Sequence, residues 1–180
     1  MIQDLFYFFN DIGFPVHIGI ETSHYISSLS GNLPIENKLN SEKHGVIWIR
    51  KLPNTENIQL FETNSRIMAY PSPDFKFVVA LYDGYNSTKF PAPSNVVVYN
   101  ENGTIHKIIS CPILKTPDRD GKFVQGYKFN NIGWTNNKKG EVTIYLDIEE
   151  SSNAYIDWYE RREFNPETGE FGEFLHRGKS

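Results

Sequence analysis

Apolar residues near the start of the chain follow a different spacing from those in the rest of it. They recur there at nearly helical intervals, at Ile2, Leu5, Phe6, Phe9 and Ile12. This spacing predicts a short helix over about residues 2–12 with a buried aromatic face, ended by Gly13 and Pro15. Residues 21–45 are polar and show no clear period, so we expect an irregular segment there.

From residue 46 to residue 177 short apolar runs alternate with turn residues, which is the pattern of antiparallel strands. The run Phe77–Leu81 is apolar on both faces and predicts a fully buried strand, whereas residues 142–148 alternate strictly, as a half-buried strand does. Asn102-Gly103 marks a tight hairpin turn. The expected strands cover residues 46–49, 58–61, 75–82, 95–99, 104–109, 122–129, 142–148, 154–164 and 171–176.

These runs predict a mainly β protein, an antiparallel meander of about 8–10 strands preceded by the short N-terminal helix. Helical crossovers of the length that a parallel sheet needs are missing from the pattern, which disfavours an α/β fold. A sandwich, a barrel and a propeller-like arrangement all fit such a meander. With 180 residues the chain has the size of one domain, which we place at residues 1–180.

Composition and cysteine usage predict a cytoplasmic protein. The chain has a net charge of −4, which argues against direct binding of nucleic acid through its phosphates. Its single cysteine, Cys111, cannot form an internal disulfide and reads as a buried structural thiol. The start lacks the basic and apolar regions of a signal peptide, and no apolar run approaches the roughly 18 residues of a membrane span. We therefore expect no membrane association.

Known catalytic and cofactor motifs are not found in the sequence. It contains no glycine-rich phosphate loop, no G-x-S-x-G elbow and no H-E-x-x-H pair. None of the five histidines lie three or four positions apart, and Asp118-Arg119-Asp120-Gly121 does not continue as a calcium loop because Tyr127 stands where the loop needs a glutamate. We expect no cofactor and no metal, and no enzymatic activity.

Charge is distributed unevenly along the chain. Residues 141–173 contain ten acidic residues and only two basic ones, Arg161 and Arg162, so their balance is −8 and that of the remaining residues is +4. Aromatic residues are interleaved with the carboxylates, a composition that suits an interface with a basic protein. The residues predicted to bind such a partner are Asp147, Glu149, Glu150, Tyr155, Asp157, Tyr159, Glu167, Glu170 and Glu173.

A small, acidic, Asn- and Ile-rich β protein without catalytic motifs resembles the immunity proteins of bacterial toxin systems, including those of contact-dependent growth inhibition. The turn Asn165-Pro166-Glu167-Thr168-Gly169-Glu170-Phe171 is similar to turns of small bacterial proteins of this general character. The resemblance implies a cognate toxin domain as partner, often a basic nuclease whose active site the immunity protein covers. It carries no site residues over to this chain.

Three hypotheses follow from the sequence. The first is an immunity-type protein that neutralises a basic toxin domain through its acidic and aromatic surface. The second is a β module that binds a small ligand or carbohydrate, with Trp48, Trp134 or Trp158 as a stacking platform. The third is a hydrolase in which two carboxylates of the acidic segment, such as Asp147 and Asp157, face one groove.

Overall fold

The computed structural model describes residues 1–9, 12–15, 43–50, 56–63, 66–118, 120–150 and 158–179. Within these ranges the protein is built from β-strands and contains no helix. The strands are β1 (Ile2–Phe9), β2 (Ile12–Pro15), β3 (Lys43–Arg50), β4 (Glu56–Thr63), β5 (Ile67–Pro71), β6 (Phe77–Tyr82), β7 (Val96–Asn100), β8 (Ile105–Ile109), β9 (Lys128–Asn136), β10 (Val142–Glu149), β11 (Trp158–Asn165) and β12 (Glu170–Lys179).

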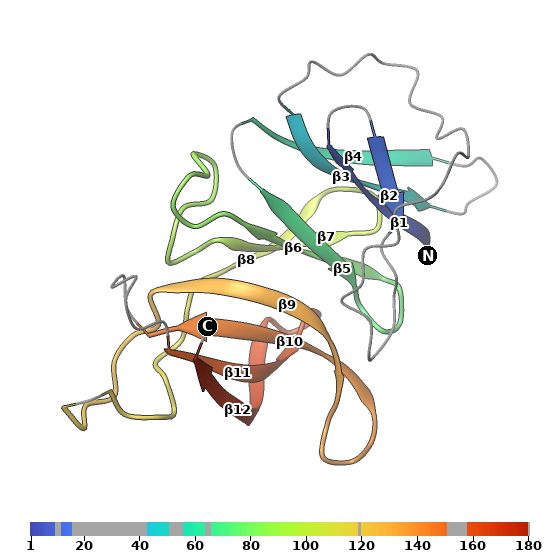
Figure 1. Ribbon diagram of the computed structural model, residues 1–180. Helices are drawn as coiled ribbons and strands as arrows, with labels where there is room; N and C mark the ends of the chain where they lie inside the picture. Colours follow the sequence, from blue (N-terminus) through green and yellow to red (C-terminus); the bar gives the residue numbers. More distant parts are fainter. Residues whose placement is uncertain are drawn as a thin grey trace.

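The strands form three antiparallel sheets of four strands each (Figure 1). The N-terminal sheet has the order β2-β1-β3-β4, the central sheet the order β5-β6-β7-β8, and the C-terminal sheet the order β12-β11-β10-β9. Strands β5 to β8 and β9 to β12 each follow one another as a meander, because hairpins join neighbours in sequence. The predicted antiparallel β architecture is therefore confirmed, and the single domain at 1–180 stays a prediction.

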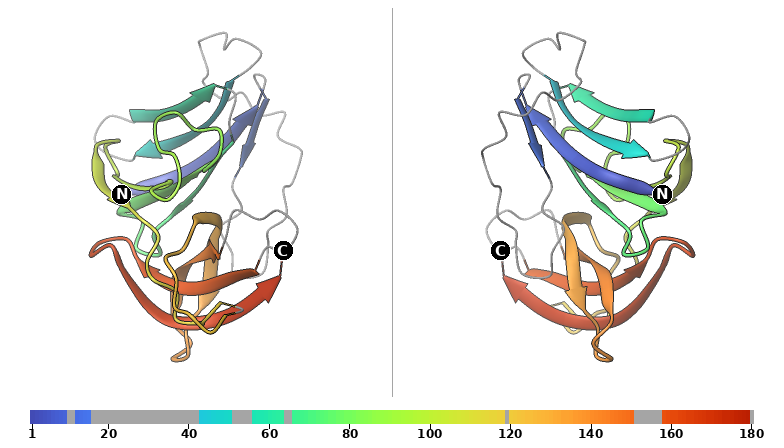
Figure 2. Two further views of the ribbon diagram at one scale, coloured as in Figure 1. Left: turned by 90° about the vertical axis from the view of Figure 1, so that its left-hand side faces the viewer. Right: turned by 90° about the vertical axis from the view of Figure 1, so that its right-hand side faces the viewer.

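The central sheet lies between the other two, and its strands β6 and β7 are buried on both faces (Figures 1 and 2). Val79 and Val98 pack against the C-terminal sheet, while Val78 and Val97 pack against the N-terminal sheet. Successive side chains of a strand point to opposite faces, so a run that is apolar at every position requires an apolar layer on each side. The prediction of a buried strand in the run Phe77–Leu81 is confirmed for residues 78–81, and Phe77 is half-buried.

The predicted N-terminal helix over residues 2–12 is wrong, because Ile2–Phe9 forms strand β1 and Ile12–Pro15 forms strand β2. The register of β1 against β3 shifts between Ile2 and Asp4, as at a β-bulge. An extra residue at that point allows Ile2 and Leu5, three positions apart, both to be buried in the core beside the central sheet. A bulged strand and a helix can thus both place buried apolar residues three positions apart in the sequence.

Two further expectations need correction. Residues 122–127 are not a strand apart from an isolated bridge between Gln125 and Ile113, and strand β9 begins only at Lys128. The register of β9 against β10 shifts where Asn130 is inserted, so β9 lacks the regular alternation that would have marked it. The described residues also form twelve strands, where about 8–10 were expected, because β1, β2 and β5 were not predicted as strands.

The hairpins at the end of each meander were predicted correctly. Strands β7 and β8 are joined by a turn in which Gly103 has a φ of 84°, and β11 and β12 by a turn in which Gly169 has a φ of 76°. Glycine adopts positive φ without the steric cost that a Cβ brings. Register shifts on both sides of Arg162 accompany the strong bend of the β11–β12 hairpin (Figure 2).

Candidate functional site

The first predicted carboxylate, Asp147 on β10, is buried in an ion pair with the neighbouring strand. Its two oxygens accept hydrogen bonds from Nε and Nη2 of Arg161 at 2.7 and 2.8 Å. The hydrogen bond to Asp147 raises the pKa of Arg161 above its ordinary value. Only 3% of Asp147 is exposed, so its charge is neutralised within the sheet and does not reach the surface.

Glu149 and Glu150 also have cationic partners. Lys128 on β9 lies 3.3 Å from the buried carboxylate of Glu149, and Nη2 of Arg177 on β12 donates a 2.7 Å hydrogen bond to Glu150. Both cations come from outside residues 141–173. The −8 balance along the sequence is therefore reduced in space by basic residues that the sheet brings alongside.

A further carboxylate of the acidic segment, Glu160 on β11, is buried on the opposite face of the C-terminal sheet from Asp147. Its Oε2 accepts hydrogen bonds from the backbone N–H groups of Lys115 and Thr116 and from the Thr116 hydroxyl, at 2.8 to 3.0 Å. Arg162 approaches its other oxygen at 3.8 Å, and burial lowers the pKa of that guanidinium. Glu160 thus secures the segment around Lys115 to the sheet.

Tyr159 is half-buried in a row of ring contacts on the same face as Asp147. The Arg161 guanidinium lies 3.8 Å from the centroid of Tyr145 and 5.9 Å from that of Tyr159. Gly133 leaves room for Tyr145, because a Cβ there would approach the ring to 2.8 Å. Tyr159 is therefore part of a packed surface layer. Tyr155 and Asp157 lie outside the described residues.

The three remaining predicted residues, Glu167, Glu170 and Glu173, are exposed at the β11–β12 hairpin. Glu173 pairs with Lys138 of the β9–β10 turn at 2.9 Å. The Nε2–H of His106 donates a hydrogen bond to the backbone carbonyl of Glu167 at 2.9 Å, which ties the hairpin turn to the central sheet. The described part of the predicted set is thus divided into a buried or half-buried group, Asp147, Glu149, Glu150 and Tyr159, and this exposed group.

A cavity of about 390 Å³ lies beside the exposed group, and we call it the carboxylate hollow. Glu163 on β11 and Glu170 on β12 supply its carboxylates, and Thr143 and Phe171 form part of its wall. The Glu173 N–H donates a hydrogen bond to Oε2 of Glu163 at 3.1 Å, which holds that carboxylate in place. Among the described residues neither Glu163 nor Glu170 forms an ion pair with a cation.

The three tryptophans that were proposed as stacking platforms are engaged within the fold. Trp48 is fully buried and donates a hydrogen bond to the carbonyl of Glu101. Trp134 donates one to the carbonyl of Pro71, and the Arg177 guanidinium lies 5.0 Å from the centroid of Trp158. Cys111 is buried, as expected, and burial raises the pKa of its thiol.

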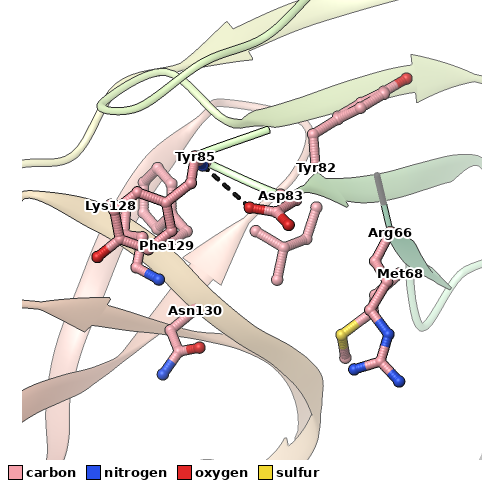
Figure 3. A pocket seen from close by; sticks show the side chains of 10 residues that line it. Arg66, Met68, Tyr82, Asp83, Tyr85, Lys128, Phe129 and Asn130 are labelled. Carbon is pink, nitrogen blue, oxygen red and sulfur yellow. Dashed lines mark hydrogen bonds between the residues drawn. The ribbon is translucent and has the colours of Figure 1, made fainter. Parts of the chain in front are cut away.

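A second cavity, of about 240 Å³, lies where the end of the central sheet meets the start of β9, and none of the predicted site residues line it (Figure 3). Arg66 precedes β5, Asp83 and Tyr85 follow β6, and Lys128 and Asn130 belong to β9. We call it the rim cavity. The only signal for it in the sequence is the polar turn directly after an apolar strand, which is a common place for a functional loop.

Asp83 is held rigidly at this cavity. It accepts hydrogen bonds from the backbone N–H of Tyr85 at 2.9 Å and from the side-chain amide of Asn86 at 2.8 Å. Burial alone would raise the pKa of Asp83, but these hydrogen bonds and the charge of Lys128 outweigh it and hold the pKa below its ordinary value. The carboxylate is therefore ionised at neutral pH.

Comparison with protein-family models, with curated proteins and with solved structures gave no match. The part of the chain that the structure describes has no group of three or more His, Cys, Asp or Glu side chains placed to hold a metal ion. The same residues include no helix of the length and apolarity that crossing a bilayer would require.

Proposed function

We propose that the protein binds a basic partner protein and that a lysine or arginine of the partner enters the carboxylate hollow. The observation that carries this proposal is the pair Glu163 and Glu170, two carboxylates that share one cavity without a cationic partner in the described residues. Two carboxylates in one cavity repel each other, and an inserted cation relieves that repulsion.

The remainder of the hollow suits a long basic side chain. Phe171 stacks at 5.9 Å on Phe129 and so presents a fixed apolar wall beside the carboxylates. Lysine and arginine bury their methylene stems against such surfaces while their charged ends reach acceptors. Charge-assisted hydrogen bonds to a carboxylate contribute about 1.5–3 kcal/mol each, enough for the hollow to act as an anchor point.

We further propose that the partner is a toxin domain and that the protein is its immunity protein. The exposed Glu167 and Glu170 of the hairpin support this assignment, because carboxylates on a projecting turn can occupy the phosphate-binding cleft of a nuclease. The internally paired Asp147, Glu149 and Glu150 are not part of the surface proposed here. The β11–β12 hairpin, by contrast, presents exposed carboxylates at Glu167 and Glu170 that a partner can contact.

The test is co-expression with the product of the neighbouring gene, followed by measurement of binding and of protection from growth arrest. E170K reverses a charge in the hollow, and D120K makes the same change at an exposed carboxylate outside it. We expect E170K to weaken binding by about tenfold or more and D120K to leave it within about twofold. Absence of binding and protection by the wild type, or equal effects of the two variants, would contradict the proposal.

A further inference from the structure

The rim cavity carries charged groups of both signs on an apolar floor. Figure 3 shows Tyr85 and Lys128 on one side of it and Arg66 and Met68 on the other. Leu81 and Phe129, which belong to the hydrophobic core, form the floor. Small-molecule sites typically combine such an apolar floor with a few convergent polar groups.

Two donor groups at this cavity lack acceptors within the described residues. Neither the guanidinium of Arg66 nor the side-chain amide of Asn130 forms a hydrogen bond or ion pair there. Lys128, by contrast, is paired with Glu149 and lies 4.0 Å from the centroid of the Tyr85 ring. Arg66 and Asn130 are therefore the groups available to receive a planar anion such as a carboxylate.

Asp83 supplies the opposite charge. A carboxylate offers about four acceptor positions. The backbone N–H groups of Tyr85 and Asn86 and the side-chain amide of Asn86 use three of them. The remaining position suits an ammonium group of a ligand.

From this arrangement we infer that the rim cavity binds a free α-amino acid. The carboxylate of the ligand contacts Arg66 and Asn130, its ammonium group contacts Asp83, and its side chain lies on Met68 and Leu81. Methionine adapts its shape readily, so this wall accommodates an aliphatic side chain. The inference is independent of the proposed partner binding, because no residue of the rim cavity belongs to the carboxylate hollow.

Calorimetric titration of the full chain with the twenty protein amino acids, one at a time, tests the inference. For the best ligand, the amine without the carboxylate and the acid without the amine are titrated as well. We expect binding of at least one amino acid, weakened about tenfold or more in each truncated analogue, since each loses a charge-assisted contact. No measurable binding, or equal binding of the acid alone, would overturn the inference.

Variants locate the site. R66Q removes the proposed carboxylate contact at the edge of the fold, and K139Q makes the same change of charge at an exposed residue of the β9–β10 turn. We expect R66Q to weaken amino-acid binding about tenfold and K139Q to leave it unchanged. D83N is expected to weaken amino-acid binding to a similar extent. Asp83 also holds its turn through hydrogen bonds, so if D83N does not fold, the test depends on R66Q alone. Equal affinity of R66Q and the wild type would exclude this cavity as the site.

Discussion

The side-chain amide of Asn95 pairs with the backbone of Phe129 in the way that a neighbouring strand would. Its Nδ2 donates to the Phe129 carbonyl at 2.9 Å, and its Oδ1 accepts from the Phe129 N–H at 3.0 Å. The same Nδ2 donates to the Tyr82 carbonyl at 2.8 Å. Asn95 is fully buried, so one side chain connects the central sheet with the C-terminal sheet beside the rim cavity.

Replacement of Asn95 by alanine should destabilise the protein strongly. N95A leaves the N–H and C=O of Phe129 and the carbonyl of Tyr82 without these partners, and each unsatisfied buried group costs about 1–3 kcal/mol. We expect the free energy of unfolding, measured in urea, to fall by about 3 kcal/mol or more. N136A, at an exposed asparagine of β9, should change it by less than about 0.5 kcal/mol. A small effect of N95A would show that the sheets do not depend on this contact.

The ion pair of Asp147 and Arg161 should show a large coupling energy. D147A leaves a half-buried guanidinium without its acceptor and should cost about 2 kcal/mol or more, while the D147A/R161M double variant should cost less than the sum of the two single changes. Urea unfolding of the wild type, D147A, R161M and the double variant gives the coupling energy between the two side chains.

The exposed pair of Lys138 and Glu173 provides the matched comparison. The side chains of this pair are 71% and 53% exposed, so a cycle of alanine substitutions there should give a coupling of less than about 1 kcal/mol. If the effects of D147A and R161M on the free energy of unfolding are additive, the two side chains have no measurable coupling energy, which would contradict the prediction.

Stability should decrease in acid partly through Asp83. Its pKa is lower in the folded protein than the ordinary 3.8, so its contribution is present above that value and is lost as the pH falls through the lowered pKa. We expect D83N to be less stable than the wild type at neutral pH and to lose less stability between about pH 5 and about pH 3. Asp74, whose pKa is also lowered, contributes with the same sign and persists in the variant. If the free energy of unfolding of D83N and of the wild type changed with pH in parallel, Asp83 would not be a source of the acid destabilisation.

The strand content and the two glycine-containing hairpins could be predicted because they depend on neighbours in sequence. Apolar and polar alternation at Ile144, Leu146 and Ile148 reports a buried face directly. The N-terminal strand could not be distinguished from a helix, because the spacing of Ile2 and Leu5 reflects a bulge whose presence depends on pairing with β3. Strand β9 was misplaced because an inserted Asn130 breaks its alternation.

Among the described residues of the predicted acidic surface, Glu167, Glu170 and Glu173 at the β11–β12 hairpin are exposed. The alternation expected over residues 142–148 places Asp147 on the face opposite Ile144 and Leu146, yet Asp147 is buried in an ion pair, as is the neighbouring Glu149. Their cations lie on the adjacent strands β11 and β9, and register determines which cation faces which carboxylate. The rim cavity escaped prediction for a similar reason, since Arg66, Asp83 and Asn130 meet only after the central and C-terminal sheets stack.

The sequence alone determined that the chain is an antiparallel β protein, where its main hairpins turn, and that acidic residues are concentrated over residues 141–173. Those properties follow from side-chain period, backbone freedom at glycine, and composition, all of which are local. Only the tertiary structure decided that strands β6 and β7 of the central sheet are buried on both faces, that Lys128, Lys138 and Arg177 reduce the charge of −8 in space, and that Glu163 shares a hollow with Glu170. These outcomes depend on which distant strands pack together, because hydrophobic stacking and Coulomb attraction act between neighbours in space whatever their separation along the chain.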